Sequence, residues 1–512
     1  MRRRAFVSSL LAAGAGPLGS ALGPAAAQPA GGPRVLLPEL PAAAPLGDAV
    51  LLGCDDRAFP FRQHVAIHLA AATNPLLVLE PGPAGSVDEV LLYYGTVIRI
   101  GDTFHMWYNG NHGPLQNRIG YERVNCRICY ARSADGIRWE KPKLGLVDFK
   151  GSKANNIVEL DAPTLWSTAA VLHDPEETDP ARRFKMAFEA RYDGALRMCV
   201  ATSPDGLRWR PSPRNPVAPF LEMAGIARYR GLYYCNGQAS FDSFGQVPAR
   251  RLSTFVSGDF ERWSPCAALG LDRTTDLHGP SGDDRLHQFE EIHLGAALWN
   301  RGNVLLGIYG QWHGDPSGDR RRVVMDLGLA LSHDALHFHE PIRGFRFVPA
   351  REQPDGPTGF GPALMQGQGM ENVGERTLYW YSLWRGTDGS GVRLVSWPRD
   401  RFSALKPFHP AAAEVISCLV QVVEAPVRLY ANASGLGAES RLRVSLLDDA
   451  FAPVPGFSGA DAVVLAADAF RAPVRWPGGD ALPARPARLR IEVRFEGLRP
   501  EDARLHALYL GA

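Results

Sequence analysis

A seven-residue turn pattern recurs along the chain and sets the period of its folding units. Ser133-Ala-Asp-Gly-Ile-Arg-Trp139 is repeated as Ser203-Pro-Asp-Gly-Leu-Arg-Trp209, and weaker copies begin at Ser257, Ser332 and Ser396. The five starts are 54 to 75 residues apart. Ser and Asp side chains can bond the backbone of a tight turn, and glycine accepts a positive φ angle. The pattern therefore predicts five similar turns, one in each of five structural units.

Each turn follows the same arrangement of short apolar segments. Two strand-like runs separated by a Gly-rich or charged turn come first, as in LYYGTVIRIGDTFHMWYNG, and a third run such as RICYAR leads into the turn. Such runs indicate antiparallel strands, and 53 glycines and 41 prolines among 512 residues supply many turns. Four strands repeated five times match the blades of a propeller. The sequence thus predicts an all-β protein with a five-bladed β-propeller over residues 85–408.

The sequence changes character outside this range. Residues 409–512 contain alternating runs such as SRLRVSLLDD and ARLRIEVRFEG without another Asp-Gly-Trp turn, which predicts a β-sandwich domain. Residues 28–84 are rich in Pro and Ala, and we expect this segment to wrap the propeller and to close its ring.

Residues 1–27 have the features of an export signal. Arg2, Arg3 and Arg4 precede a weakly apolar stretch that contains Gly14, Gly16 and Gly19, and Ala25-Ala26-Ala27 offers a cleavage site. The Arg-Arg-x-Phe core resembles a twin-arginine signal, the alternative being the basic N-terminus of a cytoplasmic protein. We therefore expect a periplasmic or secreted protein. No later stretch has 18 uninterrupted apolar residues, so no membrane insertion is expected.

Charge and cysteine content limit the partners. The 55 Lys and Arg residues nearly balance the 54 Asp and Glu residues, so the chain lacks the broad positive field that nucleic acid requires. Seven scattered cysteines do not form a disulfide scaffold, and Cys126 and Cys129 have the spacing of only half a zinc site. We predict a monomer without a cofactor. The histidines near the fourth unit leave a central metal ion or a proton relay open: His278, His287, His293 and His313.

Acidic and amide residues recur where the first strand of each unit is expected to begin. In a propeller the first strands run side by side along the axis, so these positions meet at one mouth. The residues expected there are Asp88, Glu89, Trp166, Glu222, Glu290, Glu291, Gln366 and Gln368. A ring of acids suits glycoside cleavage, in which one carboxylic acid protonates the departing oxygen and a second carboxylate activates water or attacks the sugar.

Further side chains are candidates for contacts with a sugar. Tyr94, Trp166 and Trp312 are aromatic and could stack on sugar faces, although packing between blades is the ordinary role of such residues. Glu371 lies inside a strand pattern, where it is expected to pair with a basic residue or to face the funnel. The predicted substrate-binding set is Glu89, Tyr94, Trp166, His293, Trp312, Gln366, Gln368 and Glu371. We assign His173-Asp174-Pro175 to a structural turn.

The five units, the export signal, the C-terminal sandwich and the strings YARSADGIRWEKPKLGLVDFKGSKANNIV and DPARRFKMAFEA together resemble the five-bladed furanosidase-type propeller superfamily. This superfamily includes glycoside hydrolase families 32, 43, 62 and 68. The resemblance implies that an Asp of blade one is the base or nucleophile, a role that falls to Asp88. It implies that a Glu of blade three or four is the acid, which leaves Glu222, Glu290 and Glu291, with blade four favoured.

These features predict an exported glycoside hydrolase acting on oligo- or polysaccharides. The chain contains no Asn-Asp-Pro-Asn-Gly, Arg-Asp-Pro or Glu-Cys-Pro signature in the expected order. The alternative is therefore a non-catalytic, carbohydrate-binding propeller. Phosphorolysis would require a cluster of Arg, Lys or His at the mouth, which the strand starts themselves do not supply.

Overall fold

The computed structural model describes residues 32–41, 44–112, 126–162, 165–239, 250–266, 268, 270–273, 290–351, 361–383, 391–484 and 488–512. For residues 92–94, 165–168 and Arg320 it describes the backbone alone. The expected export signal and the histidines His278 and His287 lie outside the described residues. Within this part of the chain, strands alternate with a few short 3₁₀ turns, and no helix is long and apolar enough to cross a membrane.

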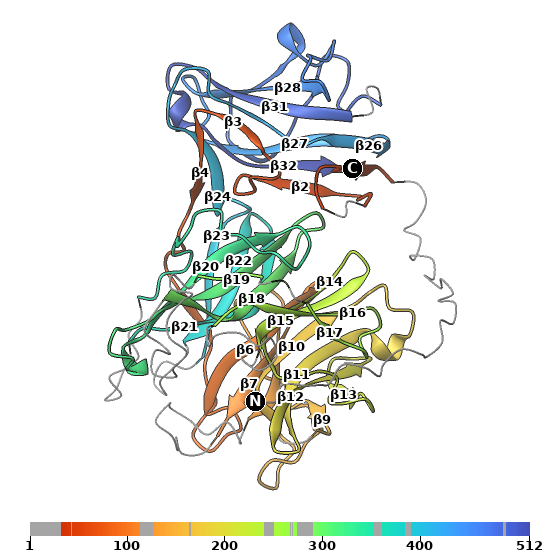
Figure 1. Ribbon diagram of the computed structural model, residues 1–512, viewed down its shortest axis with the longest axis vertical. Helices are drawn as coiled ribbons and strands as arrows, with labels where there is room; N and C mark the ends of the chain where they lie inside the picture. The colour runs from red at the N-terminus through yellow and green to blue at the C-terminus, as the bar shows by residue number, and fades with distance from the viewer. Residues whose placement is uncertain are drawn as a thin grey trace, which may run out of the picture. The chain divides into compact units, whose positions relative to one another are not determined.

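Five antiparallel meanders follow one another along the chain (Figure 1). They are β6 (Val90–Ile100), β7 (Thr103–Asn111) and β8 (Arg127–Ser133); β10 (Leu165–His173), β11 (Phe184–Tyr192), β12 (Ala195–Ser203) and β13 (Arg208–Pro211); β14 (Leu221–Tyr229), β15 (Leu232–Ala239), β16 (Ser253–Ser257) and β17 (Ser264–Pro265); β18 (Glu290–Asn300), β19 (Leu305–His313) and β20 (Val324–Ser332); and β21 (Leu364–Val373), β22 (Arg376–Leu383) and β23 (Val392–Pro398). A short strand, β9 (Glu159–Leu160), pairs in parallel with β13.

The first strands of the meanders contact one another in the cyclic order β6, β10, β14, β18, β21 and back to β6. At the last of these contacts, Gln368 of β21 pairs in parallel with Thr96 of β6. The later strands of each meander pair outward from these central strands. This arrangement is a β-propeller, and the all-β prediction is confirmed.

Four of the five recurring turns have the hydrogen bonds that their sequence predicts, whereas at the fifth Ser396 Oγ accepts from Arg376 Nη2. Ser133 Oγ accepts the Gly136 N–H at 2.9 Å, and Asp135 Oδ1 accepts the N–H groups of Ile137 and Arg138, each at 2.8 Å. Gly136 has a φ of 74°. The turns that begin at Ser203, Ser257 and Ser332 repeat these bonds, although Phe260 and Ala335 take the position of the glycine.

The tryptophans that donate hydrogen bonds to a neighbouring meander come from second strands. Trp380 Nε1 of β22 donates to the carbonyl oxygen of Gly136 at 2.8 Å, and Trp107 Nε1 of β7 donates to that of Gly206 at 2.7 Å. Trp139 closes its own turn by donating to Gly136 O at 3.1 Å. The turn tryptophans also pack between meanders, since the ring centres of Trp139 and Trp380 lie 6.3 Å apart and Trp209 shares a hydrophobic core with Trp107.

The N-terminal segment completes the last meander. Strand β5 (Leu76–Leu79) pairs antiparallel with β23, so the outermost strand of the fifth meander comes from the chain before the first one. A strand from each end of the propeller sequence thereby lies in a single sheet, which joins the two ends of the ring through backbone hydrogen bonds.

All five first strands contain a register shift against their second strands. The shifts fall between Leu92 and Thr96, Leu165 and Ala169, Met223 and Gly225, His293 and Ala296, and Gln366 and Met370. Glycine stands at or just before the end of four of these shifts, where other backbone or side-chain atoms approach closely; a Cβ on Gly295 would lie 2.5 Å from Asn236 Oδ1. Bulges of this kind bend a strand and re-aim its side chains. The side chains at the start of each central strand are therefore aimed differently from those after the bulge.

Two further sheets are formed by both ends of the chain (Figure 1). One contains β1 (Arg34–Leu36), β3 (Phe61–Gln63), β25 (Glu414–Ile416), β26 (Val420–Glu424), β28 (Arg441–Asp448), β29 (Val463–Leu465) and β31 (Arg488–Glu496). The other contains β2 (Ala49–Leu52), β4 (Val65–Leu69), β24 (Ser403–Pro407), β27 (Arg428–Ser434), β30 (Ala469–Pro473) and β32 (Arg504–Gly511). Residues of both sheets, such as Leu429 and Ile491, share one hydrophobic core.

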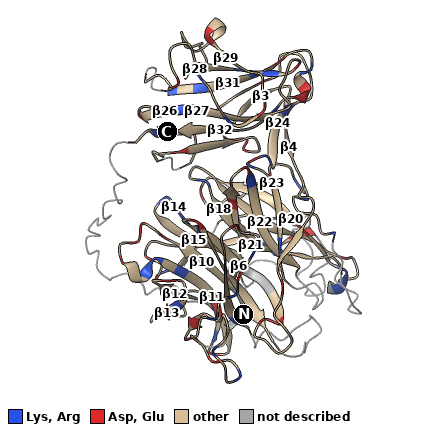
Figure 2. Ribbon diagram, turned by 180° about the vertical axis from the view of Figure 1, so that it is seen from behind, with Lys and Arg blue, Asp and Glu red and all other residues tan. Residues whose placement is uncertain are grey.

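Basic and acidic residues are interspersed over the described strands and turns (Figure 2). This distribution agrees with the net charge of +1.

Candidate functional site

The antiparallel pairing brings three strand ends of each meander to the same edge. The start of a first strand lies beside the end of the second strand and the start of the third. In the third meander Glu222 of β14 is opposite Gln238 of β15, and in the fourth Glu290 and Glu291 of β18 are opposite His313 and Trp312 of β19. The predicted acids of these two meanders therefore belong to one edge of the propeller, which we call the entry mouth.

Glu291 is a buried carboxyl group at the entry mouth. Its residue is 2% exposed, and Arg250 Nε lies 3.5 Å from Glu291 Oε2. Burial raises the pKa of Glu291, and the positive charge of Arg250 opposes this rise only in part. A carboxyl group with a raised pKa can donate a proton near neutral pH.

Arg250 connects the third and fourth meanders. Its Nη1 donates to Gln238 Oε1 at 2.9 Å, while its Cζ lies 4.2 Å from the centre of the Trp312 ring. Directly opposite residues of an antiparallel pair share a face, so Glu222 projects on the same side of its sheet as Gln238. Arg250 thus links Glu291 to Gln238, the residue opposite Glu222, and Glu222 itself is half-buried.

Glu290 projects to the other side of β18 and has different partners. It accepts from Arg273 Nη2 at 3.1 Å and lies 2.9 Å from His313 Nδ1, whose other nitrogen, Nε2, lies 3.0 Å from Asp326 Oδ2. Burial alone would raise the pKa of Glu290, but the contact with His313 and the charge of Arg273 outweigh it and lower that pKa. Burial opposes protonation of His313, but its hydrogen bonds to Asp326 and Glu290 raise its pKa to about 9.

The predicted sugar platforms at this mouth are buried or only partly described. Trp312 is fully buried and stacks on His293, with ring centres 5.8 Å apart. Trp312 therefore packs between His293 and the guanidinium group of Arg250. For Tyr94 and Trp166 only the backbone is described.

Asp88 precedes β6, as expected, but it is buried within its own meander. It is 3% exposed, accepts from Tyr108 Oη at 2.8 Å and pairs with Lys141 Nζ at 2.6 Å. The neighbouring Glu89 accepts from the Gly85 N–H at 2.6 Å. The structure therefore does not show Asp88 beside Glu222 or Glu291.

Gln366 and Gln368 tie the central strands together across the axis. Gln366 Nε2 donates to His293 O at 2.6 Å, and Gln368 Nε2 donates to Val171 O at 3.1 Å. Gln368 Oε1 accepts the Ile226 N–H at 2.5 Å. The two amides thus bond backbone groups of central strands in other meanders, which buried polar backbone groups require.

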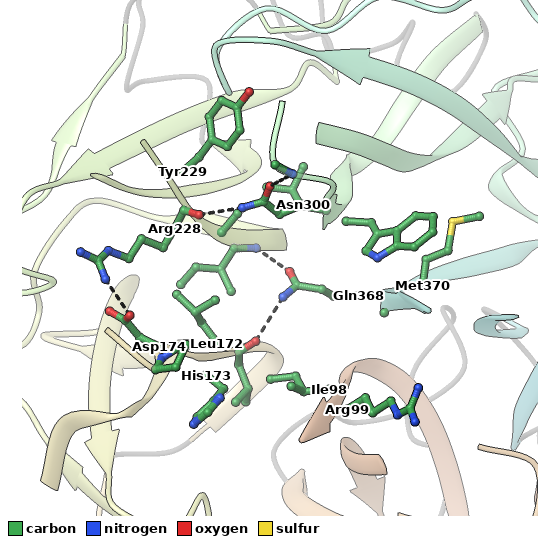
Figure 3. A pocket seen from close by; sticks show the side chains of 18 of the residues that line it. Ile98, Arg99, Leu172, His173, Asp174, Arg228, Tyr229, Asn300, Gln368 and Met370 are labelled. Carbon is green, nitrogen blue, oxygen red and sulfur yellow. Dashed lines mark hydrogen bonds and ion pairs between the residues drawn. The ribbon is translucent and has the colours of Figure 1, made fainter. Parts of the chain in front are cut away.

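A cavity of about 520 Å³ lies at the opposite edge, where the central strands end. Figure 3 shows Gln368 in its middle, Arg228 and Asp174 on one side and Arg99 on the other. Glu371 also lines this cavity, and burial raises its pKa. Gln368 and Glu371 thus lie away from the starts of the central strands. Asp174 accepts from Tyr233 Oη at 2.6 Å and pairs with Arg228, as its assignment to structure requires.

Sequence reasoning missed Arg250, Gln238 and Arg273. Only the starts of the first strands were considered, whereas antiparallel pairing also brings the ends of second strands and the residues before third strands to the entry mouth. Gln238 ends a second strand, and Arg250 precedes the third strand of its meander. Counting these positions in the repeat would have identified both residues.

No protein-family model matches the chain. Two uncharacterized proteins of Mycobacterium tuberculosis, from strains CDC 1551 / Oshkosh and H37Rv, are each 30% identical to it over 154 residues. The match covers 30% of this chain and 45% of each relative, so it spans less than half of the length of these curated relatives.

One similar solved structure comes from work on the GH130 family of mannoside phosphorylases. That family contains glycoside hydrolases that target β-1,2 mannosidic linkages in Candida mannan. The solved protein is 16% identical, with a TM-score of 0.38, and the match covers 64% of this chain and 87% of that one. The β-1,2-mannobiose phosphorylase of Listeria innocua is 14% identical, with a TM-score of 0.42 and coverage of 64% and 98%. The family named there is GH130, and not one of families 32, 43, 62 and 68. The activities named here are those of the two solved proteins.

Proposed function

We propose that the protein is a carbohydrate-active enzyme that cleaves glycosidic bonds at the entry mouth. The observation that carries this proposal is the buried carboxyl group of Glu291, which lies beside Arg250 and whose pKa burial raises. In this proposal Glu291 protonates the departing glycosidic oxygen, a step that requires an acid still protonated near neutral pH.

Glu222 is the proposed second carboxylate. It lies on the neighbouring central strand, opposite Gln238, which Arg250 links to Glu291. Its half-buried position leaves it open to solvent, as a group that activates water or attacks a sugar must be. Asp88 is less suited to this role because Lys141 and Tyr108 already engage its buried carboxylate.

Phosphorolysis is a second candidate reaction, favoured by cations that the strand starts alone did not supply. Arg250 adjoins Glu291, and Arg273 and His313 adjoin Glu290. Arginine and protonated histidine are suitable donors to phosphate oxygens. In this reaction phosphate would replace water as the group that attacks the sugar, while Glu291 keeps its role as the acid.

The test is a screen of the purified protein against aryl glycosides and an oligosaccharide panel that includes mannosides, each with and without inorganic phosphate. Release of free sugar without phosphate supports hydrolysis, and sugar phosphate formed only with phosphate supports phosphorolysis. Glu291→Gln is expected to lower kcat/KM by about 10²–10⁴, the usual contribution of a positioned acid. An aryl glycoside with a good leaving group should lose less, because its departure needs little protonation.

Glu140→Gln is the matched control, since this exposed carboxylate forms an ion pair with Arg132 near the end of the third strand of the first meander. It should leave activity unchanged. Activity that survives Glu291→Gln and Glu222→Gln undiminished would remove the proposed acid and its partner. A protein that binds oligosaccharides without converting them would instead be a carbohydrate-binding propeller.

We further propose that the protein is exported by the twin-arginine route, on the basis of the Arg-Arg-x-Phe core and the small-residue cleavage site. The test joins residues 1–40 to a reporter that is active only outside the cytoplasm. Arg3→Lys combined with Arg4→Lys should abolish export of the reporter. Export that continues unchanged would contradict this route.

A further inference from the structure

The cavity at the end of the central strands is separate from the entry mouth. Glu291 and the cavity residue Leu298 are seven positions apart on β18, which corresponds to roughly 20 Å along a strand. Gln368 lies between them on the axis, where it is hydrogen-bonded to Val171 and Ile226 (Figure 3). The cavity volume of about 520 Å³ is within the range of small-molecule sites.

Three arginines and three carboxyl groups supply most of the charged side chains of the cavity wall. They are Arg99, Arg228 and Arg230, and Asp174, Glu176 and Glu371. Asp174 and Glu176 are both engaged by Arg228 Nη1, at 2.7 and 2.9 Å. Arg99 has its own partner, with Nη2 3.8 Å from Asp102 Oδ1, and Arg230 pairs with neither Asp174 nor Glu176. Burial lowers the pKa of His173 and raises that of Glu371, so neither of these shifts favours a charged form.

Two guanidinium groups on this wall have buried donor atoms that the described protein does not satisfy. Among the described residues, Arg228 Nε and Arg230 Nη1 are each buried without an acceptor. Buried polar groups nearly always have a hydrogen-bond partner, and a charged donor without one is especially unfavourable. Both guanidinium groups belong to the cavity lining, so a ligand with negative charge in the cavity would lie beside them.

Much of the remaining lining is apolar. Ile98, Leu172 and Met370 lie around Gln368 in the cavity (Figure 3), and Ile226 also lines it. A bare inorganic ion would leave this surface uncovered, whereas a carbon skeleton would bury it.

We propose that this cavity is a second ligand site, which binds a small organic molecule that carries an oxyanion, a carboxylate or a phosphate ester. The oxyanion is held by the arginines of the wall, and the carbon skeleton contacts the apolar residues around Gln368. The site is independent of the bond-cleaving step at the entry mouth, so its test measures binding and not activity.

The experiment is isothermal titration calorimetry of the full-length protein with three probes. Hexanoate carries a carboxylate, glucose 6-phosphate carries a phosphate ester, and glucose carries no charge. We expect saturable binding of hexanoate or glucose 6-phosphate, and the comparison between them identifies which oxyanion the site takes. Glucose should not compete with the bound probe. If neither charged probe binds at millimolar concentration, the proposal is overturned.

Arg230→Gln and Arg99→Glu should each weaken binding of the preferred probe by about tenfold or more, the effect of losing one charge-assisted hydrogen bond. The side chain of Arg99 is partly exposed, so its replacement keeps the test valid if Arg230→Gln does not fold. Arg138→Glu is the control, because its side chain is 92% exposed on an outer turn and its charge change equals that of Arg99→Glu. Equal weakening by Arg138→Glu, or no weakening by either cavity variant, would overturn the proposal.

Discussion

The indole of Trp380 donates its N–H to the carbonyl oxygen of Gly136 at 2.8 Å, which joins the fifth meander to the turn of the first. The same glycine has a φ of 74°, and a Cβ at this position would lie 2.8 Å from Cζ2 of that indole. Two independent constraints thus select glycine in this turn, one from the local backbone and one from the neighbouring meander.

Gly136→Ala should therefore destabilise the propeller by about 2–5 kcal/mol, from the left-handed backbone and the overpacking of Trp380 together. Differential scanning calorimetry would measure the fall in Tm. Ala335→Gly is the matched comparison, since Ala335 already has a φ of 64° in the equivalent turn. Its change should stay within about 1 kcal/mol, because relief of the backbone offsets the lost methyl group. Equal effects of the two substitutions would show that the indole contact is unimportant.

Asp88→Asn separates a structural from a catalytic role for this residue. The substitution removes the charge that pairs with Lys141 at 2.6 Å while it keeps the side-chain size. We expect a loss of about 1–3 kcal/mol in stability, because a partly buried charge loses its partner. Once an assay exists, kcat/KM of the folded variant should change less than about threefold, whereas loss of a catalytic base would lower it by at least about a hundredfold. A fall of at least about a hundredfold in kcat/KM would instead support the role of Asp88 as base or nucleophile that is expected from the sequence.

Arg250→Gln should move the pH profile of bond cleavage. The positive charge of Arg250 lowers the pKa of Glu291, against the effect of burial, so removal of that charge raises it further. The limb of kcat/KM that falls with rising pH should therefore shift to higher pH, as long as Glu291 is the acid. Arg251→Gln is the neighbouring control, since Arg251 Nε pairs with Asp272 at 3.1 Å and not with Glu291. If the high-pH limb of kcat/KM does not shift, the ionisation that it reports is not that of Glu291.

His313 should make stability depend on alkaline pH. Its pKa is raised to about 9 in the folded protein, above the ordinary value of about 6.5 for an unfolded chain. A raised folded pKa contributes stability that is complete below about pH 6.5 and is lost as pH rises through about 9. The Tm should accordingly fall between pH 7 and pH 9.5 by more in the natural protein than in His313→Gln. Parallel Tm curves for the two proteins would exclude a contribution from the contacts of His313 with Glu290 and Asp326.

The repeat made the propeller predictable because its turns depend on local chemistry. Ser133, Asp135 and Gly136 form their hydrogen bonds within four residues, so the same letters give the same turn wherever they occur. The starts of the central strands could also be located, since each lies at a regular distance before a turn. This is why Glu222, Glu290 and Glu291 were placed near the beginnings of β14 and β18.

The direction of each side chain could not be obtained in this way. A register shift interrupts every central strand, and a shift changes which face the residues on either side of it occupy. The glycines at Gly95, Gly225, Gly295 and Gly369 were a visible trace of these bulges, but their effect depends on the approach of neighbouring strands.

Local sequence alone thus determined the strands, the turns and their order along the chain, because these follow from hydrogen bonds and apolar patterns among near neighbours. Only the tertiary structure decided that Arg250 adjoins Glu291, that Lys141 engages Asp88 and that Gln368 crosses the axis. Each of these contacts joins residues 41 to 197 positions apart, and their burial and charge have no signature in either segment by itself.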